Sequence, residues 1–141
     1  MKDRAHRTND SRRYYDWIVR AEVDLLSAKA LMNDKQLYIS SAFHCQQCVE
    51  KILKGYLLFN TNKLVDGHNL TWLCRQAMKF DEKFSDWLDE SIALNKYYIE
   101  TRYPTDFPFE ISDDVINKVY KMTNDMYTFI FSEIIGEEFS K

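Results

Sequence analysis

The 141-residue chain is predicted to be an all-α protein, an antiparallel up-and-down bundle of about five helices. Three observations favour this class. Only three Gly and two Pro occur, which leaves little material for turns and indicates few, long elements. Apolar residues recur three and four positions apart in five segments, which is the spacing of a single helix face. The loops between these segments are short, which favours antiparallel neighbours.

The first two helices are predicted over about residues 14–33 and 37–60. One face of the first helix is apolar at Trp17, Ala21, Leu25, Ala28 and Leu31. The second helix has an apolar arc at Ala42, Cys45, Val49, Ile52 and Tyr56. Asp66-Gly67 is a turn signal and ends the loop that follows.

A short third helix follows, with an inward face at Leu70, Leu73, Ala77 and Met78. The fourth is predicted over about residues 82–101, because Pro104 disfavours the α conformation at Tyr103. Its apolar side comprises Phe84, Leu88, Ile92 and Tyr98. Ser112 is the predicted N-cap of the last helix, which runs to about residue 135. The apolar stripe of this helix contains Val115 or Ile116, Val119, Met122, Met126, Phe129 and Ile130.

The length and the charge of the chain indicate its domain organisation and the kinds of partner to expect. We expect a flexible basic arm over residues 1–12 and one domain over residues 13–141. The net charge of −3 gives no basic excess of the kind that marks many nucleic-acid binders. No apolar run approaches the roughly 18 residues of a transmembrane helix, and no signal peptide is recognisable. The three Cys fit a reducing compartment, so a cytoplasmic protein without membrane contact is expected.

The most informative stretch is a polar stripe within the second helix. Gln47, Glu50, Lys51 and Lys54 fall within one narrow arc, and large apolar residues flank it at Phe43, Leu57 and Leu58. A solvated helix face rarely has such borders, so the stripe should face a cleft or another subunit. Two interpretations stay open. The stripe forms pairs within the helix, such as Glu50 with Lys54, or its two Lys hold a phosphate.

Arg102 lies near the predicted end of the fourth helix, where the helix dipole favours a cation. Arg is also the preferred bidentate ligand of phosphate, and Tyr98 lies one turn earlier. Cys45 and Cys48 have the spacing of a redox or zinc pair. They fall inside a helix rather than at its start, however, which favours buried structural cysteines. His68 is expected to help start the third helix, with a role as general base as the alternative.

These pieces together resemble the HEPN domain family. The resemblance rests on four segments in the family's order, from Trp17 to Pro104: Trp17 with Ala21, Asp24-Leu25 and Ala28; Ala42-Phe43 with Gln46-Gln47, Glu50-Lys51 and Leu53-Lys54; Gly67-His68-Asn69-Leu70; and Tyr98 with Arg102-Tyr103-Pro104. It implies a helical bundle that forms homodimers and binds a nucleotide or RNA. A small nucleotidyltransferase is the implied partner, as in toxin–antitoxin pairs. No cofactor and no metal are implied.

The family's ribonucleases carry an Arg followed by a His after four to six residues. This chain lacks that pair, since its last His is His68. The leading hypothesis is therefore a protein that binds phosphate between the second and fourth helices. Lys51, Lys54 and Arg102 are the expected phosphate contacts, with Gln47 and Tyr103 nearby. The alternatives are a ribonuclease with an atypical catalytic site and a purely structural interaction module.

Overall fold

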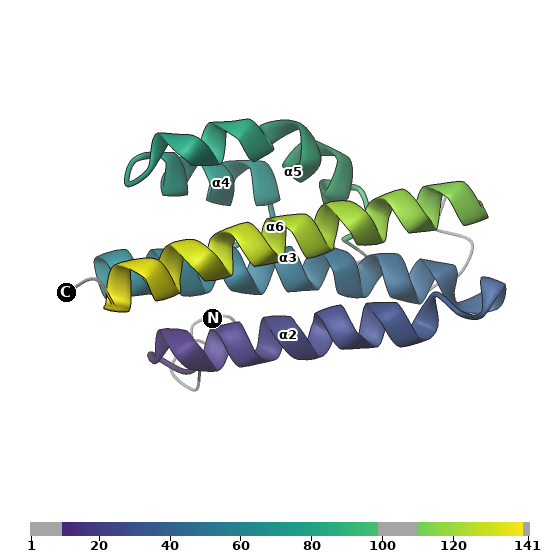
Figure 1. Ribbon diagram of the computed structural model, residues 1–141, viewed down its shortest axis with the longest axis horizontal. Coiled ribbons are helices and arrows are strands. Elements are labelled where there is room, and N and C mark those ends of the chain that lie inside the picture. The colour runs from purple at the N-terminus through teal and green to yellow at the C-terminus, as the bar shows by residue number, and fades with distance from the viewer. Residues whose placement is uncertain (1–9, 99–109, 140–141) are drawn as a thin grey trace.

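The computed structural model describes residues 10–98 and 110–139, and this part of the chain contains helices and no strand. Three long helices lie side by side, and a layer of short helices covers one side of them (Figure 1). The long helices are α2 (Tyr14–Leu31), α3 (Tyr38–Thr61) and α6 (Asp113–Phe139). The short helices are α4 (Leu70–Met78) and α5 (Leu88–Asn95), with 3₁₀ turns at η1 (Lys35–Leu37) and η2 (Glu82–Trp87). The predicted all-helical bundle is confirmed.

Side-chain contacts fix the directions of the three long helices. The start of α2 meets the end of α6, where the Tyr14 hydroxyl donates to Glu138. The starts of α3 and α6 meet where the Tyr38 hydroxyl donates to Asp113 at 2.8 Å. Helix α6 is therefore antiparallel to α2 and runs in the same direction as α3 (Figure 1). The layer of α4 and α5 brings the chain back to α3, where the Tyr98 ring lies 6.5 Å from that of Phe43.

Helix α3 lies at the centre of the core and packs on α2, α4 and α6. Every residue of its predicted apolar arc is fully buried. Its contact with α2 is close, since a Cβ added at Gly55 would lie 3.2 Å from Trp17 Cβ. A larger residue at position 55 would push the two helices apart.

The ends of the helices follow local hydrogen bonding. The Ser112 hydroxyl accepts a hydrogen bond from the Val115 N–H at 3.2 Å, which confirms the predicted cap of α6. Asn69 caps α4 by accepting from the Trp72 N–H at 3.1 Å, so it fills the role expected of His68. Gly67 has a φ of 101°, a left-handed conformation that glycine adopts without strain.

The fourth predicted helix is wrong in where it starts and in one residue of its apolar side, Ile92, whereas Phe84 is fully buried as predicted. The Asp81 carboxylate accepts from the Lys83 N–H at 2.9 Å and begins the 3₁₀ turn η2, so α5 starts only at Leu88 and ends at Asn95. A 3₁₀ turn has three residues per turn and shifts the register of the helix after it. Ile92 is consequently 57% exposed, and Ser91 and Leu94 are buried in its place.

Two further boundaries are settled by the described helices. Ile116 rather than Val115 is buried at the start of α6, and α6 continues beyond residue 135 to Phe139. Residues 1–9, most of the predicted basic arm, lie outside the described part. No helix in the described part is both long and apolar enough to span a bilayer.

Candidate functional site

Two buried carboxylates organise the polar side chains around α3. Asp24 of α2 is 6% exposed and Glu50 of α3 is 5% exposed. A charged carboxylate in such a place must be paired and hydrogen-bonded, because burial removes its hydration. Each of the two binds one Lys from α3 and one His.

The Asp24 cluster joins α2 to α3. Asp24 Oδ2 accepts from Lys51 Nζ at 2.6 Å, and Asp24 Oδ1 lies 2.8 Å from His44 Nδ1. Both oxygens therefore have a donor. The Lys51 side chain stays 26% exposed, so its ammonium can also reach solvent.

The Glu50 cluster joins α3 to the start of α4. Glu50 Oε2 accepts from Lys54 Nζ at 3.0 Å, and Glu50 Oε1 lies 2.9 Å from His68 Nδ1. The Gln46 Nε2 donates to Glu50 Oε1 at 3.3 Å and to the His68 backbone carbonyl at 3.1 Å. A charged carboxylate only accepts hydrogen bonds, so His68 Nδ1 is the donor in this contact.

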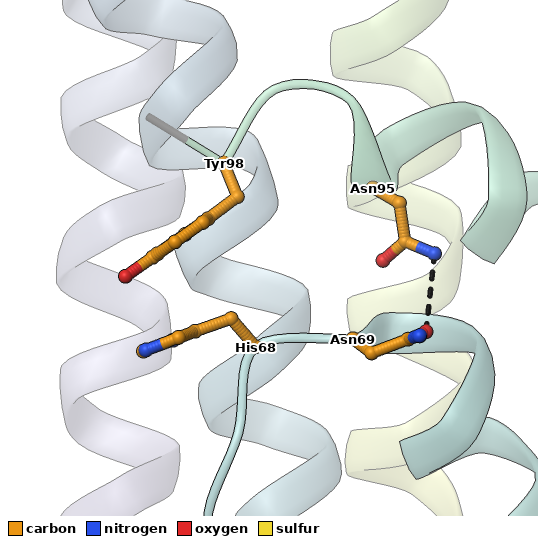
Figure 2. A pocket seen from close by; sticks show the side chains of 4 residues that line it. All are labelled: His68, Asn69, Asn95 and Tyr98. Atoms are coloured by element: carbon orange, nitrogen blue, oxygen red, sulfur yellow. Dashed lines mark hydrogen bonds between the residues drawn. The ribbon is translucent and has the colours of Figure 1, made fainter. Parts of the chain in front are cut away.

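His68 also lines an open hollow of about 420 Å³ together with Asn69, Asn95 and Tyr98 (Figure 2). The His68 and Tyr98 rings stack with centroids 4.1 Å apart and planes 14° apart. Across the hollow, Asn95 Nδ2 donates to Asn69 Oδ1 at 3.2 Å. Asn95 Oδ1 accepts from the Leu70 N–H at 2.6 Å. The hollow thus joins the start of α4 to the residues that follow α5.

The structure brings together only part of the predicted phosphate site. Lys54 is buried against Glu50, whereas Lys51 binds Asp24 on the α2 side of the same helix. Gln47 donates to Gln46 at 2.8 Å. Arg102 and Tyr103 lie outside the described residues. The expectation that the charges of the stripe have partners is confirmed for Lys51 and Lys54.

Sequence reasoning missed Asp24 as the partner of Lys51, which is 27 residues away in the chain. One signal was available. Asp24 lies between Ala21, Leu25 and Ala28 on the buried face of α2, and an acid in that position needs a cation. His68 was identified as a candidate base, but its partner Glu50 was not.

The three cysteines are fully buried and unpaired. Burial raises the pKa of the Cys45 thiol to about 11, against a hydrogen bond with Thr123 that lowers it. Burial likewise raises the pKa of Cys48 well above its usual value. Cys45 and Cys48 are therefore buried core side chains, as the sequence favoured. Within residues 10–98 and 110–139, no group of three or more His, Cys, Asp or Glu is arranged to hold a metal ion.

Comparison with known proteins agrees with this architecture. A family model described as the HEPN domain matches residues 14–134. Putative toxin MJ1304 of Methanocaldococcus jannaschii is 32% identical over 94 residues, which are 62% of this chain and 61% of that protein. The match therefore spans less than two thirds of the relative's length.

Two crystal structures are similar over 86% of this chain and 98% of their own. TT1696 from Thermus thermophilus has a TM-score of 0.75 at 24% identity, which supports the fold. ST0689, described as an archaeal HEPN homologue, has a TM-score of 0.69 at 25% identity. The match to the family model over residues 14–134 shows that the chain belongs to the HEPN domain family.

Proposed function

We propose that this HEPN protein binds the phosphate of a nucleotide or an RNA strand in a cleft between α3 and the chain that follows α5. The observation that carries the proposal is the hollow at His68, Asn69, Asn95 and Tyr98, which lies beside the Glu50 cluster of α3. Its lining offers imidazole, amide and phenol groups, which suit the hydrogen-bonding atoms of a ribose–phosphate backbone.

Lys51 is the described cation that best suits a phosphate contact. Its ammonium has three donors, of which Asp24 takes one, and the side chain is partly exposed. Lys54 is more deeply buried and acts by offsetting the charge of Glu50 near the hollow. Gln47 lies on the same face of α3. Arg102 and Tyr103 follow Tyr98 by four and five residues, so a fully extended chain would place Arg102 within about 14 Å of it.

The asparagine amides add donors at the hollow. Asn69 Oδ1 accepts from the Trp72 N–H and from Asn95 Nδ2, so the two Nδ2–H groups of Asn69 are left for a ligand. No partner for them is found among the described residues. Proteins that bind single-stranded RNA stack bases on aromatic side chains, and Tyr98 supplies an aromatic ring at the hollow.

A binding titration tests this proposal. The probe is a fluorescent single-stranded RNA with 2′-O-methyl riboses, with ATP as competitor. We expect Lys51→Ala and Arg102→Ala each to weaken binding about tenfold and to lower the salt dependence by roughly one counterion. Lys121→Ala is the matched control, because it removes one exposed Lys from the surface of α6. Affinities equal to wild type would remove Lys51 and Arg102 from the site, and no binding by wild type would overturn the proposal.

We also propose that the protein forms a homodimer through an apolar stripe on α2. Tyr15, Val19, Val23 and Leu26 are 48% to 62% exposed and follow each other by four, four and three positions, so they share one face. In an antiparallel two-fold pair, Val19 would meet Val23 of the second copy, and Tyr15 would meet Leu26. Such a stripe can pack on itself.

Sedimentation of the wild type and of Val19→Asp/Val23→Asp tests the dimer. The charged variant should be a monomer at concentrations at which the wild type is a dimer. Leu37→Asp, at another exposed apolar position, is the control and should leave the dimer intact. A monomeric wild type, or a dimer that tolerates both Asp residues, would contradict this interface.

The protein partner that we propose is a small nucleotidyltransferase, in a toxin–antitoxin pair. The support is the family membership and the relative named as a putative toxin. A nucleotidyltransferase gene beside this gene, whose product co-purifies with it, is the expected result. If the two proteins elute separately when co-expressed, the pairing fails.

A further inference from the structure

One face of α4 carries an exposed aromatic ring and two cations. Four residues at helical spacing form it, on the side of α4 away from the core: Trp72, Arg75, Gln76 and Lys79. Trp72 is 46% exposed, and Arg75 and Lys79 are exposed as well. A Trp side chain is usually well buried, so an exposed Trp beside two cations marks this face, here called the α4 stripe, as a candidate binding surface.

Within the described part of the chain, neither cation of the α4 stripe is paired with an acid. The Arg75 side chain has no hydrogen bond or ion pair with any described residue. Lys79 Nζ donates to Gln76 Oε1 at 2.8 Å, and this bond uses one of its three donors. Helix α4 itself contains no Asp or Glu. The α4 stripe therefore offers two positive charges to an anion, on a chain whose net charge is −3.

The α4 stripe begins at the hollow. Asn69, which lines the hollow (Figure 2), caps α4 and accepts from the Trp72 N–H at 3.1 Å. Trp72 lies three residues after Asn69, so the stripe continues the face on which Asn69 lies. At a rise of about 1.5 Å per residue, Lys79 lies about 15 Å beyond Asn69 along α4. A mononucleotide in the hollow covers only part of this distance, whereas a strand of several nucleotides spans it.

The composition of the α4 stripe suits a nucleic-acid strand better than a protein. Protein interfaces gather apolar residues at their centre and are depleted in Lys. The α4 stripe has one aromatic ring, and its other members are polar or cationic. Proteins bind single strands with such groups, because bases stack on aromatic rings while cations contact the phosphates between them.

Resting on the proposed function, which brings the phosphate of a nucleotide or an RNA strand to the hollow, we propose that the α4 stripe is a second subsite for single-stranded RNA. A base stacks on the Trp72 ring. Arg75 binds a phosphate through two N–H groups, and Lys79 binds the next phosphate along the strand. The strand leaves the hollow at Asn69 and follows α4 toward its C-terminal end.

The experiment measures the binding of two probes to the wild type and three variants. A fluorescent single-stranded RNA of about 12 nucleotides with 2′-O-methyl riboses covers the hollow and the α4 stripe, and AMP covers the hollow alone. The variants are Trp72→Ala, Trp72→Phe and Arg75→Ala/Lys79→Ala. The Trp fluorescence of each protein is recorded as RNA is added. Trp72 is the most exposed of the three Trp residues, so a base that stacks on it should quench this signal.

Two further variants on α6 are the matched controls. Lys118→Ala/Lys121→Ala removes two exposed Lys, and Phe139→Ala removes an aromatic ring that is 79% exposed. Thermal unfolding is measured for every variant, because a cation at the C-terminal end of a helix also stabilises the helix. Binding is then compared at a temperature at which all the proteins are folded.

We expect Trp72→Ala to weaken RNA binding about tenfold without changing its salt dependence, and Trp72→Phe to keep most of the affinity. Arg75→Ala/Lys79→Ala should lower the slope of log affinity against log salt by about 1.4. RNA should quench the Trp fluorescence of the wild type but not that of the two Trp72 variants. AMP should bind to all the variants as it does to the wild type, and both controls should match the wild type with both probes.

Wild-type affinity for RNA in Trp72→Ala and in Arg75→Ala/Lys79→Ala overturns the second subsite and leaves the proposed function standing. Equal losses of affinity for RNA and for AMP also overturn it, because the stripe would then act only on the ligand in the hollow. A wild type that binds neither probe overturns the proposed function itself, and the second subsite with it.

Discussion

Lys54 Nζ lies 3.0 Å from Glu50 Oε2, and neither side chain is more than 9% exposed. Each charge is out of water and depends on the other. Glu50→Leu leaves the Lys54 ammonium buried and unpaired, so we expect the free energy of unfolding to fall by about 3–5 kcal/mol. Replacing both residues, as Glu50→Leu/Lys54→Leu, should recover most of this loss. Urea unfolding followed by circular dichroism measures both values.

The exposed pair Lys121–Asp125 on α6 is the control for this comparison. It has the same i,i+4 spacing and a distance of 2.6 Å, but the Lys121 side chain is 77% exposed and that of Asp125 is 42% exposed. Asp125→Ala should therefore cost less than about 1 kcal/mol. A similarly small cost for Glu50→Leu would mean that Lys54 reaches solvent and does not depend on Glu50.

The Tyr56 hydroxyl is a polar group in the core whose removal should change the stability of the protein. The side chain is fully buried against Phe84, and its hydroxyl has no hydrogen-bond partner among the described residues. The nearby Asn60 amide donates instead to the Tyr56 backbone carbonyl at 2.9 Å. Tyr56→Phe removes an unsatisfied hydroxyl, so we expect the protein to gain about 1 kcal/mol of stability and about 3 °C in Tm.

Thermal unfolding of Tyr56→Phe beside Tyr38→Phe measures this effect. The Tyr38 hydroxyl donates to Asp113, so its removal should lower Tm slightly. A lower Tm for Tyr56→Phe as well would show that the Tyr56 hydroxyl has a partner in solution.

The carboxyl groups of Asp81 and Glu133 predict a pH dependence of stability. Burial raises the pKa of Glu133, and its hydrogen bond with Asp81 raises it further, against a bond from Lys83 that lowers it. The folded protein therefore holds the Glu133 proton more tightly than the unfolded chain does. Stability from this proton is present below the unfolded pKa, near 4.3, and is lost as pH rises through the raised folded pKa.

Glu133→Gln keeps a donor for Asp81 and cannot titrate. The pKa of Asp81 is lowered overall. Burial alone would raise it, but hydrogen bonds from the Lys83 backbone and from Glu133 outweigh this effect. The stability that Asp81 contributes is lost only as pH falls through its lowered pKa. The Gln side chain of the variant still offers Asp81 a hydrogen-bond donor. Urea unfolding between about pH 4 and 7 should show the variant gaining stability relative to wild type as pH rises. Glu82→Gln, at an exposed position, should show no such trend.

The parts of the fold that the sequence predicted well are those set by long periodic patterns. Helices α2, α3 and α6 are long enough for one buried face to determine them. The start of α5 depends instead on one local bond, from the Lys83 N–H to Asp81, which changes the register without changing the apolar composition. In the site, the Glu50–Lys54 pair follows from helical spacing. The Asp24–Lys51 and Glu50–His68 contacts join segments 27 and 18 residues apart, which spacing within one helix does not reveal.

The thiols of Cys45, Cys48 and Cys74 are predicted to be unreactive in the folded protein. Burial raises the pKa of Cys45 and of Cys74 to about 11, and that of Cys48 well above its usual value. At pH 8 the reactive thiolate is therefore scarce, and the core excludes the reagent. Iodoacetamide followed by mass spectrometry should label none of the three within an hour in the native protein and all of them in urea. Rapid native labelling of Cys45 and Cys48, or a disulfide between them, would show an accessible redox pair inside α3.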